Sequence, residues 1–215
     1  MPPGNLYRLT SEDLMHTLEN WDSLMSSRVH LIACGGTALT LLNIKESTKD
    51  IDFTVPIENE YKKLIKFLND IGYIEGGGGL QHPDDPNFIY QFWEGDYVFT
   101  TQLLDPVLNT GMHIPIQKWS RIYLGVLNLI DLIVTKIIRG TSADMSDCMA
   151  AFETGKVDQD SLLERYSAAA EYDLNPKETM LNFYYFAEKL LEKQLVDNQY
   201  FESVKLILDE FRARP

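Results

Sequence analysis

The sequence predicts an α/β (α+β) fold in which helices flank a mixed β-sheet and a helical segment follows at the C-terminus. Three patterns indicate it. Val29–Cys34 is an almost continuous apolar run stopped by Gly35 and Gly36, which is typical of a strand buried on both faces. Between residues 73 and 124, apolar residues recur with a period of two. From residue 128 onward the period is helical.

Helices and strands alternate in the first third of the chain. Residues 10–25 predict a helix that begins with Thr10 and Asp13 as a capping pair. Pro56 ends a later strand. The elements that follow the first helix are a strand at 29–34, a short helix at 37–42, a strand at 51–55 and a helix at 58–71.

The rest of the chain divides into strands and then helices. We expect strands at 88–93, 97–104 and 113–116, and helices at 128–139, 144–152, 161–170, 177–193 and 198–212. The four glycines from Gly76 to Gly79 predict a mobile hairpin or lid, since no Gly-Lys-Ser/Thr follows them as in a P-loop. A break near Gly155 and Lys156 predicts two domains, 1–155 and 156–215.

Composition and charge exclude several classes of protein. The 215 residues are 45% hydrophobic and 24% charged, which is ordinary for a globular protein. The formal net charge of -13 opposes binding that depends on neutralising many phosphates. A protein that coats DNA or RNA is therefore not expected.

Cysteine usage and hydropathy indicate a compartment. Cys34 and Cys148 have no Cys-x-x-Cys or His/Cys partners, so neither a disulfide framework nor a zinc site is expected. A reducing cytoplasm fits this pattern. No basic and apolar leader and no run of 18 apolar residues is found, so we expect no association with a membrane.

Two aspartates in one predicted strand are the strongest indication of chemistry. Asp50 and Asp52 are separated by one residue, so a strand projects both carboxylates from the same face. Two like charges at that separation are unfavourable unless a cation lies between them. The alternative is that Asp50 only ends a loop while Asp52 points to solvent at a sheet edge.

Three enzyme classes use an Asp-x-Asp of this kind. Asp50–Thr54 matches the tail of the motif of haloacid dehalogenase-like phosphatases, but Glu46–Lys49 is not the apolar strand that leads into a nucleophilic aspartate there. Glycosyltransferases that use sugar nucleotides usually need a larger chain. Only the third class also explains Gly35 and Gly36.

In that third class a strand ends in Gly-Gly or Gly-Ser, a helix follows, and the next strand carries the paired acids. Val29–Cys34, Gly35–Leu39 and Thr48–Phe53 stand in this order. The sequence resembles the nucleotidyltransferases of the DNA polymerase beta superfamily over about its first two thirds. It is similar in particular to their small prokaryotic branch, which includes abortive-infection and toxin-antitoxin nucleotidyltransferases.

The resemblance implies a Mg²⁺-dependent transfer of a nucleoside monophosphate from a nucleoside triphosphate to an acceptor hydroxyl. Asp50 and Asp52 would be the catalytic carboxylates that hold Mg²⁺, with Mn²⁺ as the alternative metal. The nucleotide-binding residues would be Gly35, Gly36, Thr37, Lys49 and Lys136. Glycines allow the backbone to approach the triphosphate, while the Thr37 hydroxyl adds a hydrogen bond or only caps the helix that starts there.

The family usually has a third carboxylate on a later strand beside the pair. Residues 97–104 should supply it but contain no acid, while Glu94, Asp96 and Asp105 lie at strand ends. We select Asp96 as the third catalytic acid. If none of these acids reaches the pair, the alternative is a nucleotide-binding or toxin-antitoxin-type interaction protein that does no chemistry.

Two further features concern Lys136 and the binding partners. Asn128–Lys136 resembles the family's segment in which a helix begins with an acid and carries a lysine one turn on. Lys136 would point toward phosphate or Asp50, or simply reach solvent. The expected acceptor is a small molecule, a protein or an RNA end. The aromatic run Phe183–Phe186 leaves a homodimer or a cognate protein partner open.

Overall fold

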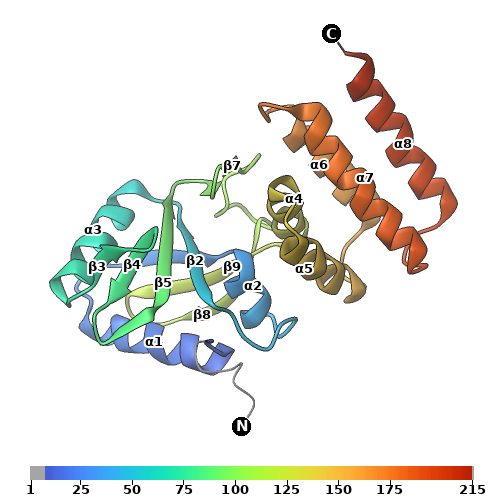
Figure 1. Cartoon of the computed structure of the whole chain (residues 1–215). Coiled ribbons are helices and arrows are strands. Elements are labelled where there is room, and N and C mark those ends of the chain that lie inside the picture. The colour runs from blue at the N-terminus through green and yellow to red at the C-terminus, as the bar shows by residue number, and fades with distance from the viewer. Residues whose placement is uncertain (1–7, 215) are drawn as a thin grey trace. The chain divides into compact units, whose positions relative to one another are not determined.

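A mixed sheet of seven strands organises the first part of the chain, and its order is β3-β4-β5-β2-β1-β9-β8 (Figure 1). The computed structural model describes residues 8–214 and confirms the α+β fold with a helical C-terminal part. Central β1 (Val29–Ala33) pairs antiparallel with β2 (Asp50–Val55) and parallel with β9 (Ile122–Leu127). The other strands are β3 (Ile74–Gly76), β4 (Gly79–His82), β5 (Asp85–Glu94) and β8 (His113–Lys118).

Three helices accompany this sheet: α1 (Ser11–Leu24), α2 (Gly35–Leu41) and α3 (Glu58–Asp70). The predicted capping pair is confirmed, because the Thr10 hydroxyl accepts from the Asp13 N–H and the Asp13 carboxylate accepts from the Thr10 N–H. Trp21 of α1 lies against the ring of Phe92 at 6.3 Å between centroids. Helix α1 therefore covers the sheet face that carries Phe92.

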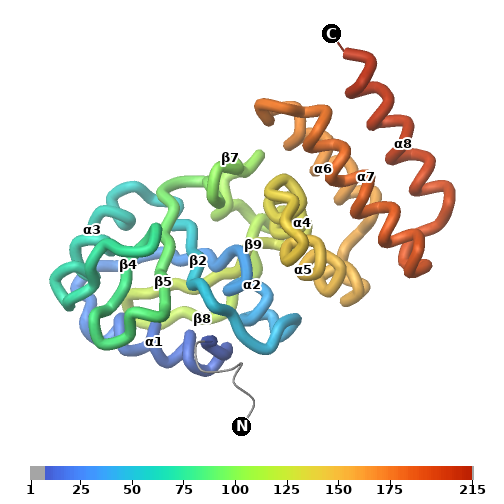
Figure 2. Tube along the Cα trace, viewed as in Figure 1, coloured from blue at the N-terminus to red at the C-terminus, as the bar shows by residue number. Residues whose placement is uncertain are grey.

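The four-glycine stretch forms a tight β-hairpin. Gly77 and Gly78 are the two turn residues between β3 and β4, with φ of 61° and 89°. Two positive φ angles in a two-residue turn belong to the type I′ geometry that suits the twist of a hairpin. Gly79 is equally constrained, since a β-carbon there would lie 2.6 Å from the Tyr90 carbonyl oxygen. Figure 2 shows β5 between β4 and β2.

One strand prediction is wrong and one strand was not predicted. The single strand expected at 97–104 is a separate small hairpin of β6 (Tyr97–Val98) and β7 (Thr101–Gln102). Phe99, with φ of 54°, turns the chain between them. The strand that was not predicted is β9, which pairs with β1 from Ile122 to Val126. Because β9 is almost entirely buried, it lacks the alternation of apolar and polar residues that marks a half-buried strand.

The helices after residue 128 form a second compact unit, with the division between Asn128 and Leu129. They are α4 (Leu129–Arg139), α5 (Ser142–Glu153), α6 (Gln159–Ala170), α7 (Pro176–Glu192) and α8 (Asn198–Ala213). The sequence instead suggests a boundary at Gly155 and Lys156, which lie just after α5. In the structure α4 packs on α6 and α7, so it groups with the later helices. Across residues 8–214, no helix has the length and hydropathy needed to cross a lipid bilayer.

Candidate active site

The chain turns from β1 into α2 at Gly35 and Gly36, the first two residues of the helix, and neither position has room for a side chain. Gly35 has φ of +58°, and a β-carbon built on it would lie 2.3 Å from Oδ2 of Asp52. A β-carbon on Gly36 would lie 2.7 Å from the Thr48 hydroxyl oxygen. Both distances are too short for real side-chain atoms, so any larger residue would displace its neighbour. We call Gly35 and Gly36 the glycine turn.

We call the two predicted acids, Asp50 and Asp52, the acid pair, and Gly35 of the glycine turn lies against Asp52. Asp50 is the first residue of β2 and is exposed, whereas Asp52 is only 5% exposed. Alternation along the strand puts both carboxylates on one face. Strand β2 lies inside the sheet between β1 and β5. The alternative, with Asp52 pointing to solvent from a sheet edge, is therefore wrong.

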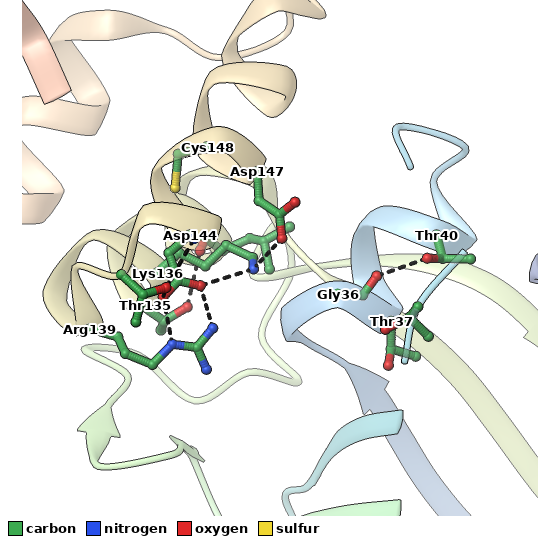
Figure 3. Close-up of polar contacts among 12 residues, drawn as sticks. Gly36, Thr37, Thr40, Thr135, Lys136, Arg139, Asp144, Asp147 and Cys148 are labelled. Carbon is green, nitrogen blue, oxygen red and sulfur yellow. Dashed lines mark hydrogen bonds and ion pairs between the residues drawn. The ribbon is translucent and has the colours of Figure 1, made fainter. Parts of the chain in front are cut away.

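Thr37 connects α2 to β2. Its hydroxyl donates to the Asp50 carbonyl oxygen at 3.1 Å and accepts from the Asp52 N–H at 2.8 Å. Thr37 is fully buried, so its hydroxyl holds the backbone that carries the acid pair. The helix begins at Gly35, two residues before the expected start, and Thr40 donates to the Gly36 carbonyl oxygen at 3.0 Å (Figure 3).

Thr48 supports the same strand from outside it. Its hydroxyl donates to the Asp50 carbonyl oxygen at 2.8 Å, and its side chain is buried under Gly36. No local pattern singles out Thr48, since a threonine just before a strand has many ordinary uses. Lys49 follows it and is exposed beside Asp50.

The strand beside the acid pair is β5, and this corrects the expectation that residues 97–104 lie there. Strands β2 and β5 run parallel, with Gln91 opposite Asp52 and Ile89 opposite Asp50. Gln91 therefore stands where a third carboxylate next to Asp52 would come from. Its amide nitrogen donates to the Gly78 carbonyl oxygen at 3.2 Å. An amide at this position offers a neutral oxygen in place of a charged one.

The acids expected near the pair have other positions. Asp96 accepts a hydrogen bond from the Val107 N–H at 2.7 Å through Oδ1, which fixes the loop after β7. Glu94 is opposite Val55, so it projects from the other face of the sheet than Asp52. Across residues 8–214, no group of three or more His, Cys, Asp or Glu side chains gathers in a way that could hold a metal ion.

Lys136 belongs to the second unit, where it is part of a buried ion cluster on α4 and α5 (Figure 3). Its ammonium lies 2.8 Å from Asp147 Oδ2 and 3.4 Å from Asp144 Oδ1. The Lys136 side chain is 4% exposed, so the alternative in which it simply reaches solvent is wrong. Arg139 contacts Asp144 through Nε at 2.7 Å and through Nη2.

The charge state of Asp144 follows from these contacts. Burial raises the pKa of its carboxyl group, but hydrogen bonds from Arg139 and Thr141 and the nearby charge of Lys136 outweigh burial. The result is a pKa lowered to about 2, so Asp144 is ionised at neutral pH.

A separate ion pair joins α4 to α6. Arg165 Nε lies 2.7 Å from Asp131 Oδ1.

The acid pair can take a divalent metal only with help from a substrate. Mg²⁺ in proteins is commonly held by one or two carboxylates, with substrate phosphates and water completing its six ligands. Asp50 and Asp52 supply the two carboxylates that such a site needs, and Asp50 is exposed at the start of β2. The residues present therefore fit a Mg²⁺ ion that arrives with a polyphosphate.

Comparison of the chain with protein-family models, with curated proteins and with solved structures finds no match.

Proposed function

We propose that this protein is a Mg²⁺-dependent nucleotidyltransferase of the DNA polymerase beta superfamily. It would transfer a nucleoside monophosphate from a nucleoside triphosphate to an acceptor hydroxyl. The observation that carries the proposal is the contact between the glycine turn and the acid pair, where Gly35 leaves room for nothing larger than hydrogen beside Asp52. This contact supports the proposal because the glycine turn and the acid pair are the two sequence features on which the resemblance depends.

The acid pair and the glycine turn have complementary tasks in this proposal. Mg²⁺, when bound, supplies positive charge that stabilises the leaving pyrophosphate and lowers the pKa of an attacking hydroxyl. Exposed Asp50 is accessible to metal and substrate, whereas buried Asp52 is kept at a defined position by the Thr37 hydrogen bond to its N–H. The glycine turn lets the triphosphate approach the backbone without a side chain in between. Mn²⁺ is the alternative metal.

The expected partners and location are part of the same proposal. A nucleoside triphosphate is one substrate, and the acceptor is a small molecule, a protein or an RNA end. We infer that the protein works in the cytoplasm, where buried thiols such as Cys34 and Cys148, which form no disulfide, are kept reduced. In this proposal exposed Lys49 is a nucleotide contact, and Lys136 is one only if its ammonium leaves Asp144 and Asp147. Asp96 is the third acid only if its carboxylate leaves the Val107 N–H.

Removal of both carboxylates tests the proposal. The Asp50→Asn and Asp52→Asn double variant should retain the fold, since Asn is nearly isosteric, and should lose transfer of labelled α-phosphate by about 10³-fold or more. The matched control is Asp70→Asn with Asp84→Asn, which removes the same charge from exposed positions. Equal labelling by the acid-pair variant and the parent would contradict the proposal.

One observation favours a second candidate, a nucleotide-binding protein that performs no transfer. Gln91 stands next to Asp52 in place of a carboxylate. Without a third charge, the group that activates an acceptor hydroxyl is incomplete, while binding of a metal-nucleotide complex remains feasible. Such a protein would act through the partner that it contacts, as in a toxin-antitoxin-type pair.

Calorimetry with each nucleoside triphosphate and Mg²⁺ separates the two candidates. Binding together with release of pyrophosphate supports the transferase. Binding without turnover supports the second candidate, and restored turnover in Gln91→Glu would then locate the missing group. Asp96→Asn tests the third-acid prediction, with loss of turnover at unchanged affinity as the result that would support it. No binding of any triphosphate would remove both candidates.

A further inference from the structure

A cavity of about 400 Å³ lies between α3, the β3–β4 hairpin and β5, the strand that pairs with β2 beside the acid pair. It lies within the size range of small-molecule sites in proteins. Six of the residues that line it matter here: Tyr61 and Ile65 of α3, Glu75 of β3, and Gln91, Phe92 and Trp93 of β5. Tyr61 and Trp93 are the aromatic residues whose rings are not engaged by α1, whereas the Phe92 ring packs against Trp21 and Phe53, and Phe92 matters here through its backbone. The three glycines of the hairpin that border the cavity add no side chains.

The cavity exists because β4 is shorter than β5. Strand β4 runs antiparallel to β5 with Leu80 opposite Tyr90, so its first residue lies near Gln91. Strand β5 continues beyond that point to Glu94. Backbone polar groups alternate in direction along a strand. Gly95 donates its N–H to the Val55 carbonyl oxygen of β2, so the N–H and C=O of Phe92 point away from β2, past the end of β4. The backbone of Phe92 therefore presents one hydrogen-bond donor and one acceptor at the edge of β5 that β4 does not cover.

The charges around the cavity select its ligand. No lysine, arginine or histidine is among the described residues that line it, so it has nothing to neutralise a phosphate. Glu75 provides an exposed acceptor. Burial raises the pKa of Tyr61, and the charges of Glu94 and Glu75 raise it further, so its phenol stays a hydroxyl group. Flat rings, acceptors and one backbone donor suit an uncharged planar heterocycle that carries amino hydrogens.

We propose that this cavity binds the base of a nucleotide, and specifically a base with an exocyclic amino group. The proposal rests on the proposed function for the rest of the nucleotide. Gln91 links the two places, because it lines the cavity and is opposite Asp52 in the neighbouring strand. Adjacent strands are about 5 Å apart, which is within the span between the base and the phosphates of one nucleotide.

Nucleosides without phosphate test the cavity alone. Calorimetry on the full chain should detect adenosine, guanosine or cytidine, and uridine, which lacks the amino group, should bind about tenfold more weakly or not at all. Tyr61→Ala should weaken nucleoside binding by at least about fivefold through loss of stacking. Glu75→Gln, at an exposed position of β3, should weaken it as well. Tyr185→Ala, at a half-exposed tyrosine of α7, is the matched control and should leave it unchanged.

Inorganic tripolyphosphate with Mg²⁺ tests the acid pair separately. Nucleoside binding that survives Asp50→Asn with Asp52→Asn but is weakened by Tyr61→Ala and Glu75→Gln supports the base site, whether or not tripolyphosphate binds. Tripolyphosphate binding that requires the acid pair, without binding of any nucleoside, would overturn the base site and leave the proposed function standing. Nucleoside binding unaffected by both cavity variants would also overturn it.

Discussion

At the scale of single residues, Gly35 is the described glycine that a side chain would crowd most. Its backbone is left-handed and the Asp52 carboxylate occupies the place where a side chain would begin. A left-handed conformation costs a non-glycine residue about 1 kcal/mol, and overpacking adds about 1–3 kcal/mol. Gly111 also has a positive φ, of 86°, but a β-carbon there would meet nothing within 4 Å.

These two glycines form a matched pair for experiment. Gly35→Ala should lower the free energy of unfolding by about 2–4 kcal/mol, whereas Gly111→Ala should lower it by about 1 kcal/mol. Tryptophan fluorescence in urea suits the measurement, because Trp21, Trp93 and Trp119 all lie in the first unit. Equal losses in the two variants would show that Asp52 yields easily and that the glycine turn is not required by the acid pair.

At the scale of elements, the buried ion cluster joins α4 to α5. Lys136 and Arg139 come from α4, while Asp144 and Asp147 come from α5, so the cluster carries two charges of each sign. Each buried charge is compensated by a partner, which a buried ion pair needs if it is not to destabilise the fold. Thr141 contributes by donating its hydroxyl to Asp144 Oδ2 at 2.6 Å while it caps α5.

The lowered pKa of Asp144 predicts how this element responds to acid. Because the pKa of about 2 is below the ordinary value, the ionised carboxylate stabilises the folded state above about pH 4, and this contribution is lost as the pH falls toward 2. The contribution is about 2 kcal/mol. Asp144→Asn should therefore lower the protection of α4 and α5 amides from hydrogen exchange at pH 6, and the difference from the parent should shrink below pH 4.

The control for this experiment is Asp209→Asn on α8. Asp209 is 72% exposed and lies 3.6 Å from Arg212, so it should change stability little at any pH. A loss of protection in Asp144→Asn that is the same at pH 3 and pH 6 would contradict the pKa argument. The loss of protection would then come from altered packing around residue 144 and not from the loss of its charge.

At the scale of the whole molecule, a net charge of -13 disfavours a long polynucleotide as the acceptor. Polynucleotide binding gains most of its affinity from phosphates neutralised by lysine and arginine. We therefore expect no retention of a single-stranded RNA of about 40 nucleotides in a filter assay near 150 mM salt, where proteins with basic grooves bind strongly. A mononucleotide with Mg²⁺ brings its own cation and is not subject to this repulsion. Tight, salt-sensitive binding of the RNA would contradict the prediction.

Local patterns were sufficient for most elements and for the core of the site. The capping pair of α1, the strand that ends at the glycine turn and the acid pair on β2 follow from short-range rules about apolar periodicity, glycine and side-chain alternation. The same rules failed at β9 and at residues 97–104. Strand β9 is buried on both faces and therefore has no alternating pattern, and the Phe99 turn depends on a positive φ that phenylalanine rarely adopts.

Apolar periodicity and the order of strand, glycines, helix and paired acids along the chain were enough to predict the fold class and to assign Gly35 and Asp52 to one candidate site. The contact between these two residues follows from the pairing of β1 with β2. The pairing of β5 with β2 puts Gln91 beside Asp52 in place of an acid, and no local pattern predicts it. The burial of Lys136 between Asp144 and Asp147 likewise requires α4 and α5 to be packed together. Strand order and ion pairing depend on contacts between distant segments, which hydrophobic periodicity does not encode.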